Sequence, residues 1–307
     1  MLKRVVVGVC LVSSFLGCEP PPNGVVTAHG FQQTETHYRI QAREDGSLLP
    51  KDWRLDNLFE EKQLDGTIEL KPKKTPEYRT TLSFDFDGDG QTDATHETYT
   101  HDLRWVHDRH QGVIWARSVP VSNQLRHVDL DVLITSYVEE ASGAGYEGIA
   151  FGAHQGAVEH RYVAKLIHSR EGYLGRQEAI DAEIEVANSE QLKLDPKARW
   201  QHVRLIIARG PVDHVEAVGA VGKEDPRFPV LIVLGYANSP DHYDEGAVDF
   251  DDLLTRVAAG GGHGFSVPPT NRSSDAKKAT DAQPAAATPV AAPAGSAAPA
   301  GSAAPAP

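Results

Sequence analysis

Alternating apolar and polar residues predict β-strands in the first half of the chain. Residues 37–43, 67–70 and 78–86 alternate in this way, and residues 103–106 and 113–119 flank a short polar turn. Successive side chains of an extended strand point to opposite faces of a sheet, so alternation places one apolar face on a core. The sequence therefore predicts several strands before residue 120, with the last two paired as a hairpin.

Apolar residues recur at helical intervals between Leu130 and Ala141. Their spacing places them on one face of a helix, and Gly143 is predicted to end it. Residues 128–134 also alternate, which leaves a strand as the other interpretation of this stretch. We prefer the helix because the longer spacing continues through Ala141.

Three more strands are predicted after this helix. Residues 180–187 alternate between apolar and acidic side chains, which predicts a half-buried strand with one face in solvent. Residues 203–208 form a strongly apolar strand. Residues 230–234 are apolar without interruption, as is typical of a strand that is covered on both faces.

A final amphipathic helix is predicted from Ser239 onward. Ser239 suits the N-cap and Pro240 suits the first helical position, and acidic residues in the first turn favour the positive end of the helix dipole. Apolar residues then recur at helical spacing as far as Val257. The glycines at 260–262 are predicted to end this helix.

The order of these elements favours the α+β class, with a mainly antiparallel sheet covered by helices. Residues 37–267 carry the patterns and are expected to form the folded domain, with a possible boundary near residue 110. The order of strands and helices in residues 112–258 resembles the PsbP-type αβα sandwich. That resemblance implies a fold whose members are mostly non-enzymatic and act through partner-binding or assembly surfaces.

The start of the chain resembles the signal peptide of a bacterial lipoprotein. Lys3 and Arg4 precede twelve uncharged residues, a length that suits a signal-peptide core and is too short to span a bilayer. The resemblance implies that residues 1–17 are removed and that Cys18 carries three acyl chains. Two chains already give stable anchoring, so residues 18–36 would act as a tether to an inner or outer bacterial membrane. An ordinary secretory signal that leaves Cys18 as a free thiol is the alternative.

Residues 268–307 contain little that a fold would bury. From residue 276 onward, 15 of 32 residues are Ala and 6 are Pro, and one six-residue sequence occurs twice. Such a composition predicts a disordered tail. The tail is either a spacer that reaches a partner or the cell wall, or a segment without function.

Charge and cysteine content exclude several classes of protein. Of the 307 residues, 43 are acidic and 30 are basic, which gives a formal net charge of -13. No cluster of Lys or Arg offers a surface for nucleic acid. The two cysteines, Cys10 and Cys18, rule out a disulfide scaffold and a cysteine-based zinc site. No further stretch of apolar residues has the length of a transmembrane helix.

One motif carries recognisable chemistry, the run of residues 85–93. Calcium prefers six to eight oxygen ligands, and carboxylates at alternate positions of a tight loop can converge on one ion. The run resembles the calcium loop of FG-GAP-type repeats, in which the ion lies between two strands; it occurs once here, so a propeller is not implied. The predicted ligands of this Ca2+ ion are Asp85, Asp87, Asp89, Gln91 and Asp93.

The predicted calcium loop is not an EF-hand. Its twelfth position holds His96 instead of a bidentate Glu, and the flanking residues are predicted to be extended. Four carboxylates within nine residues repel one another unless a cation neutralises them, which favours a bound ion. The alternative is a solvated acidic turn without metal. A structural role is expected for the ion, because nothing nearby suggests a nucleophile or a phosphate-binding loop.

Histidine and aspartate residues also crowd one short segment, residues 101–110. A hairpin at this place would bring two or three imidazoles together. The segment lacks the His-Glu-x-x-His spacing of a helical zinc site, so polar strand faces or a pH-sensitive surface are the simpler interpretations. The residues concerned are His101, Asp102, His107, Asp108 and His110.

The sequence leads to three hypotheses about function. The first is a membrane-anchored, non-enzymatic lipoprotein that binds or assembles with another envelope protein or a cell-wall component and holds one structural calcium ion. The second is an envelope metalloenzyme or hydrolase that uses residues 101–110. The third is a lipoprotein that binds a small ligand. A deep polar pocket favours the second or third hypothesis, and a flat apolar patch favours the first.

Overall fold

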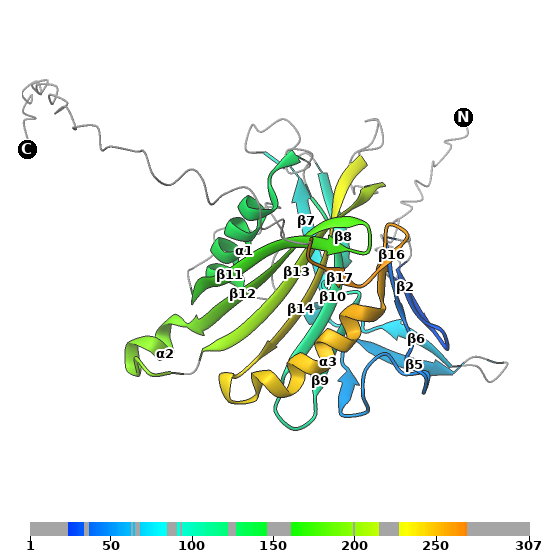
Figure 1. Cartoon of the computed structure of the whole chain (residues 1–307), viewed down its shortest axis with the longest axis horizontal. Helices are drawn as coiled ribbons and strands as arrows, with labels where there is room; N and C mark the ends of the chain where they lie inside the picture. The colour runs from blue at the N-terminus through cyan, green and yellow to red at the C-terminus, as the bar shows by residue number, and fades with distance from the viewer. Residues whose placement is uncertain are drawn as a thin grey trace, which may run out of the picture. The chain divides into compact units, whose positions relative to one another are not determined.

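An antiparallel sheet of eight strands lies at the centre of the described structure (Figure 1). The computed structural model describes residues 24–33, 37–62, 64, 68–84, 91–92, 94–121, 127–145, 161–198, 200–214 and 227–268. The strand order is β17-β11-β12-β13-β14-β10-β9-β4, and every neighbouring pair is antiparallel. Its strands are β4 (Trp53–Leu55), β9 (Leu103–His107), β10 (Val113–Pro120), β11 (Tyr162–Leu174), β12 (Gln177–Asn188), β13 (Gln201–His214), β14 (Arg227–Asn238) and β17 (Phe265–Ser266).

A second antiparallel sheet and two hairpins complete the described strands. The second sheet has the order β1-β2-β3-β15-β16, so the strand that follows the last helix pairs with one near the start of the chain. In the hairpins, β5 pairs with β6 and β7 pairs with β8. These strands are β1 (Gly24–Thr27), β2 (Gly30–Gln33), β3 (Tyr38–Gln41), β5 (Leu58–Lys62), β6 (Ile68–Pro72), β7 (Arg79–Phe84), β8 (Ala94–Tyr99), β15 (Val257–Ala259) and β16 (Gly262–His263).

Two α-helices pack against the central sheet (Figure 1). Helix α1 (Leu130–Ala144) lies along β11 and β12, and helix α3 (Tyr243–Arg256) lies against β14. The shorter helical segments are η1 (Pro76–Tyr78), α2 (Ser189–Leu194) and η3 (Pro240–His242). In the part of the chain that the structure describes, no helix is both long and apolar enough to cross a lipid bilayer.

Both faces of the central sheet are buried. On one face, Leu133 of α1 shares an apolar core with Leu205 and Ile207 of β13. On the other face, Phe250 of α3 shares a second core with Ile206 of the same strand and with residues of the second sheet. Successive residues of β13 therefore enter different cores, which explains why residues 205–208 of β13 and 230–234 of β14 are apolar without alternation.

A glycine lets the central strands accommodate a large side chain. Gly235 of β14 lies directly opposite Trp115 of β10 in the antiparallel register. A Cβ atom at position 235 would lie 2.0 Å from a ring atom of Trp115, closer than any side chain tolerates. The buried indole ring thus requires glycine across the strand pair.

The mainly antiparallel sheet predicted from the sequence is confirmed. The hairpin of β9 and β10 forms as predicted, and the segment before residue 112 contributes β9 and β4 to the central sheet. The predicted cover by helices is only partial, because one face of the central sheet is covered by α3 together with the second sheet. The alternating strand interpretation of residues 128–134 is wrong, since α1 begins at Leu130.

Both predicted helix ends were placed wrongly. Gly143 lies inside α1, and Gly145, with a φ of 79°, follows the last helical residue and donates its N–H to the carbonyl of Ala141. Helix α3 ends at Arg256 because Val257 already pairs with β3 as part of β15. Gly260 and Gly261 form the turn between β15 and β16, and Gly262 begins β16.

The predicted solvent face of β12 is not exposed at Asp181. Its side chain is 6% exposed, and its carboxylate accepts hydrogen bonds of 2.6–3.2 Å from Arg170 and Arg204. Arg204 also binds Asp251 of α3 at 2.6 Å. The Asp181 carboxylate therefore joins β11, β12 and β13 to α3. Periodicity tells which face a side chain occupies, and does not tell whether another element covers that face.

We predict that Asp181→Ala lowers the free energy of unfolding by about 3–5 kcal/mol, because it leaves the guanidinium of Arg204 without its main partner. Urea unfolding of the purified chain measures this. Glu190→Ala is the control; Glu190 forms an exposed ion pair with Lys193, and its loss is expected to cost less than about 0.5 kcal/mol. Equal losses in the two variants would contradict a central role for Asp181.

Candidate functional site

Helix α3 carries a polar face made by Asp249, Asp252 and Arg256. These residues are three and four positions apart and lie on one side of the helix, while Phe250 faces the core. The polar face meets the segment that joins β3 to β4. Trp53, at the end of that segment, donates its indole N–H to Asp249 Oδ2 at 2.8 Å. Helical spacing thus gives α3 one side for the core and one for this segment.

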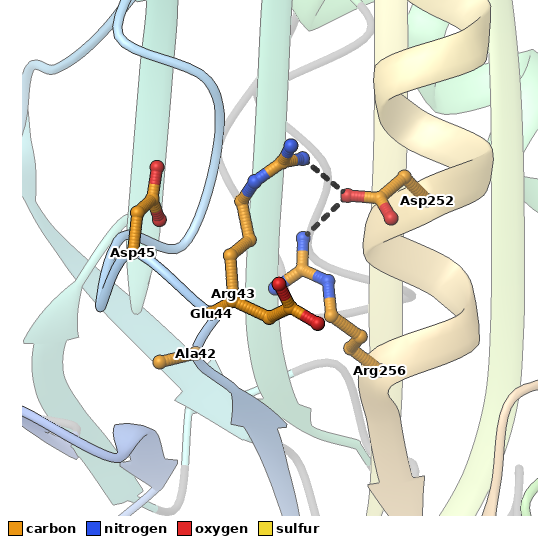
Figure 2. Close-up of a pocket in the computed structure, with 6 residues that line it drawn as sticks. All are labelled: Ala42, Arg43, Glu44, Asp45, Asp252 and Arg256. Carbon is orange, nitrogen blue, oxygen red and sulfur yellow. Dashed lines mark hydrogen bonds and ion pairs between the residues drawn. The ribbon is translucent and has the colours of Figure 1, made fainter.

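A hollow of about 450 Å³ lies between the polar face of α3 and the residues that follow β3 (Figure 2). This volume falls within the roughly 300–1,000 Å³ of typical ligand pockets. Its walls carry two guanidinium groups and three carboxylates. The lining residues are Ala42, Arg43, Glu44, Asp45, Asp252 and Arg256.

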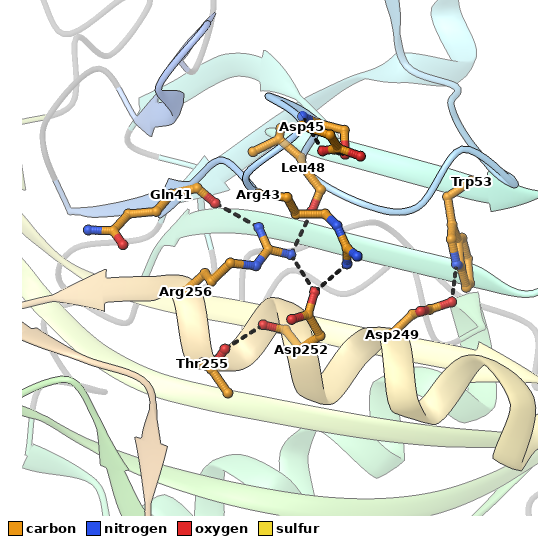
Figure 3. Close-up of polar contacts among 10 residues, drawn as sticks. Gln41, Arg43, Asp45, Leu48, Trp53, Asp249, Asp252, Thr255 and Arg256 are labelled. Atoms are coloured by element: carbon orange, nitrogen blue, oxygen red, sulfur yellow. Dashed lines mark hydrogen bonds and ion pairs between the residues drawn. The ribbon is translucent and has the colours of Figure 1, made fainter.

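The two guanidinium groups converge on one carboxylate oxygen (Figure 3). Arg43 Nη1 lies 2.7 Å from Asp252 Oδ2, and Arg256 Nη2 lies 3.0 Å from the same atom. Arg256 also donates to the backbone carbonyls of Gln41 at 2.6 Å and Leu48 at 2.7 Å. Its side chain is 14% exposed and that of Arg43 is 34% exposed. Arg256 therefore holds the wall in place, and Arg43 is the cation that a ligand can reach.

The carboxylates of the hollow differ in what they contact. Asp45 accepts hydrogen bonds from the backbone N–H of Ser47 at 3.0 Å and from its hydroxyl at 2.6 Å. These hydrogen bonds hold the pKa of Asp45 below its usual value. Glu44 is exposed and has no side-chain partner among the described residues. The segment after β3 thus offers the hollow a partly exposed guanidinium, that of Arg43, and an exposed carboxylate, that of Glu44, which has no side-chain partner among the described residues.

This arrangement is suited to binding charged groups. Arginine stays protonated at every physiological pH, so neither guanidinium acts as a general acid or base. Among the six lining residues, the carboxylates of Glu44, Asp45 and Asp252 are the groups that can exchange a proton. The chemistry available is recognition of charged groups by a mixed-charge wall.

The predicted lipidation and calcium residues lie mostly outside the described residues. Cys18, Asp85, Asp87, Asp89 and Asp93 belong to this group, and of the predicted calcium ligands only Gln91 lies within the described residues, where it is exposed. The predicted calcium ligands belong to the chain between β7 and β8, and these two strands pair antiparallel up to Phe84 and Ala94. The predicted extended flanks are therefore confirmed, and calcium binding stays a prediction.

The structure divides residues 101–110 into two separate groups. His101 and Asp102 lie before β9, whereas His107 ends β9 and His110 lies in the turn that follows. The five residues of β9 span about 16 Å at roughly 3.3 Å per residue. His101, Asp102 and His107 therefore do not converge on a common point, whereas the rings of His107 and His110 come together, with their centroids 3.6 Å apart. Across the described residues, no group of three or more His, Cys, Asp or Glu is placed to hold a metal ion.

The group at the start of β9 is part of the core. Asp102 is 3% exposed and accepts hydrogen bonds from the Tyr38 hydroxyl at 2.8 Å, the Ser118 N–H at 2.8 Å and the Ser118 hydroxyl at 3.1 Å. Burial and the nearby carboxylate raise the pKa of Tyr38 well above its usual value. Burial, followed by the positive charges of Arg117 and Arg104, lowers the pKa of His101 well below 6.5. These groups join the second sheet to the central sheet.

Sequence reasoning missed the hollow. Arg43 and Asp252 are 209 positions apart, and no local pattern connects them. The only signal was the i, i+4 spacing of Asp252 and Arg256 on a predicted helix, which is common on exposed helix faces.

Comparisons with known proteins do not identify a family. No protein family and no curated protein matches the chain. Among solved structures, the solution structure of the cyanobacterial PsbP protein (CyanoP) from Synechocystis is 14% identical, with a TM-score of 0.30. The match covers 66% of this chain and 92% of that chain. A TM-score this low carries no argument, and the PsbP-type sandwich stays a prediction.

We predict that Asp252→Asn lowers the free energy of unfolding by about 1 kcal/mol, the upper range for a partly exposed ion pair. The substitution leaves Arg43 and Arg256 facing each other without a shared anion. Urea unfolding tests this, with Glu44→Gln as the control in the same hollow. Glu44 contacts no described side chain, so its substitution is expected to change stability by less than about 0.5 kcal/mol. A larger effect in the control would contradict the arrangement.

Proposed function

We propose that this chain is a membrane-anchored lipoprotein of the cell envelope, and that its folded domain is a non-enzymatic binding or assembly module with one structural calcium ion. The observation that supports a binding role is the lining of the hollow, which brings together two guanidinium groups and three carboxylates. The cationic start, the uncharged run and Cys18 support the anchor. The order of strands and helices supports a PsbP-type sandwich, which belongs to the same proposal.

The lipid anchor is tested by Cys18→Ala in a bacterium that produces the chain. We expect the unchanged chain to incorporate labelled palmitate and to sediment with membranes, because acyl chains on Cys18 insert in a bilayer. The variant is expected to lose the label and to leave the membrane fraction. A variant that keeps both properties would rule out the anchor at Cys18.

Calcium binding is tested by thermal unfolding of the purified chain in calcium and in chelator. An ion that binds only the folded state adds about 2.7 kcal/mol of stability at a hundredfold excess over Kd. We expect calcium to raise Tm in the unchanged chain and in Glu44→Gln, and to have no effect in the double variant Asp87→Ala, Asp89→Ala. Equal Tm values in calcium and chelator for the unchanged chain would leave an acidic turn without metal.

The hollow also favours a second candidate function, the binding of a small ligand. A ligand that binds both of these side chains carries an anionic group that meets Arg43 and a cationic group that meets Glu44. Amino acids and short peptides with free ends have this chemistry.

Calorimetry with the dipeptide Ala-Ala tests this function. We expect Arg43→Gln to weaken binding at least tenfold, which corresponds to about 1.4 kcal/mol. N-acetylation of the dipeptide removes the charge that would meet Glu44 and is expected to weaken binding to the unchanged chain. The control is Arg54→Gln, since Arg54 is 60% exposed and its ion pairs lie on the other side of the segment, with Asp56 and Asp108. Absence of binding, or equal loss in the control, would exclude this ligand class.

A further inference from the structure

Three imidazole rings form a column between the turn after β9 and the start of α3. The rings of His107 and His110 are parallel within 6°, with their centroids 3.6 Å apart. The ring of His242, in η3, stacks on the other side of His110 at 5.4 Å. Trp53 of β4 meets the edges of this column, 5.0 Å from His107 and 6.3 Å from His110. The column thus brings together segments that are far apart in the sequence.

Hydrogen bonds fix the protonation state of His110. Its Nδ1 atom lies 2.8 Å from Asn238 Nδ2 and accepts a hydrogen bond of 3.3 Å from the N–H of Gly112. The amide of Asn238 has a defined orientation, because the N–H of Ser239 donates to its Oδ1 at 2.8 Å. Asn238 Nδ2 is therefore the donor toward His110. Two donors at Nδ1 require this atom to be unprotonated, so His110 is a neutral imidazole.

Asn238 connects the column to the end of β14. The residue is 3% exposed, and its Nδ2 also lies 3.0 Å from the backbone carbonyl of His242 and 3.1 Å from the Tyr236 hydroxyl, so two amide hydrogens are shared among three acceptors. A Cβ atom at position 112 would lie 2.8 Å from Asn238 Nδ2, so glycine is required for this close approach. We name the group His107, His110, Asn238 and His242 the histidine latch. It holds the turn after β9 against the junction of β14 and α3.

A proton on His110 opposes every contact of the latch. It would place an N–H at Nδ1 against two donors, and a positive charge 3.6 Å from the ring of His107. His107 Nδ1 in turn accepts the N–H of Arg109 at 3.3 Å, which makes this ring an acceptor at Nδ1 as well. The protonated latch therefore loses the hydrogen bonds that His110 Nδ1 accepts, and the new N–H at this atom is repelled by the two donors that face it.

Some of the charged groups around His110 raise its pKa and others lower it. His107 and Arg109 from the turn and His242 from η3 disfavour a positive charge, although Asp52 binds the Arg109 guanidinium at 2.6 Å. Glu245 of α3 favours the charge, but it lies 3.3 Å from His242 Nδ1. Burial, followed by the charge of His107, dominates and lowers the pKa of His110 below 6.5.

We propose that the histidine latch is an acid-sensitive device, in which protonation of His110 releases the turn after β9 from the junction of β14 and α3 while the sheet stays folded. The closed form keeps His110 neutral, whereas an open form exposes it to water with an ordinary pKa near 6.5. The closed form is therefore fully favoured above about pH 6.5 and loses stability as pH falls below that value. Trp53 and Tyr236 of one apolar core touch the latch. Both cores also contain residues of β12 and β13 that the latch does not include, such as Ile180 and Ile206, and these keep the sheet intact.

Hydrogen exchange of the full chain between pH 7.5 and 5.5 tests the latch, with rates corrected for their intrinsic pH dependence. We expect exchange at residues 107–113 and 238–246 to rise at least tenfold at the lower pH, and exchange at residues 180–187 to stay unchanged. Protonation of His101 would be seen at the other end of β9, near residues 99–103. Exchange in the latch segments that does not change with pH would overturn the proposal.

Two substitutions separate the latch from general acid sensitivity. His110→Phe keeps a stacked ring without a titrating group and is expected to remove the pH response, while His168→Phe, at an exposed histidine of β11, is expected to retain it. Asn238→Asp replaces the donor with a carboxylate that stabilises protonated His110. NMR titration is expected to show the His110 midpoint at least one pH unit higher in this variant. A response that survives in His110→Phe, or an unchanged midpoint in Asn238→Asp, would overturn the proposal.

Discussion

Helix α3 packs Phe250, Leu253 and Leu254 against the central sheet, and this contact fixes the position of everything on its other side. Burial of these side chains is non-directional and sets how close the helix lies to the sheet. An α-helix has 3.6 residues per turn, so Asp249 and Asp252 lie on a different side of α3 from Phe250. On that side they bind Trp53 and Arg43, which lie in the chain after β3. The hollow is thus a consequence of packing on the opposite side of one helix, and its shape depends on that core.

The two buried aspartates show two different ways to keep a carboxylate inside an acidic protein. Asp181 lies under α3 and is neutralised by Arg170 and Arg204. Asp102 lies between the two sheets and accepts hydrogen bonds from a tyrosine hydroxyl and from both donors of Ser118. A buried carboxylate without such partners would cost several kcal/mol. In both places the partners come from different elements, so each carboxylate also fixes how those elements meet.

Local patterns predicted α3 and several strands, among them β7, β9, β10, β12, β13 and β14, because alternation and helical spacing are properties of neighbouring residues. They gave no prediction of β11, although it pairs with β12 along its length. They failed where a distant element decides the outcome. The end of α3 is set by pairing of Val257 with β3, and the burial of Asp181 is set by Arg204 and the helix above it. The latch depends on Asn238 and His110, which are 128 positions apart. Sequence placed histidines in the right turn, but only the fold supplies the amide that keeps one of them neutral.

The two ends of α3 are held by different chemistry, and this limits how far a change at one end can spread. The latch, just before the first turn, depends on His110, whose pKa is lowered below 6.5 by burial and which is neutral at physiological pH. Arg256, at the last turn, binds backbone carbonyls and stays charged at any such pH. Trp53 lies between the two ends; it meets the ring of His107 and donates to Asp249. Loss of the latch removes one restraint on Trp53 and leaves the other, so acid loosens the start of the helix while its end stays fixed to the segment after β3.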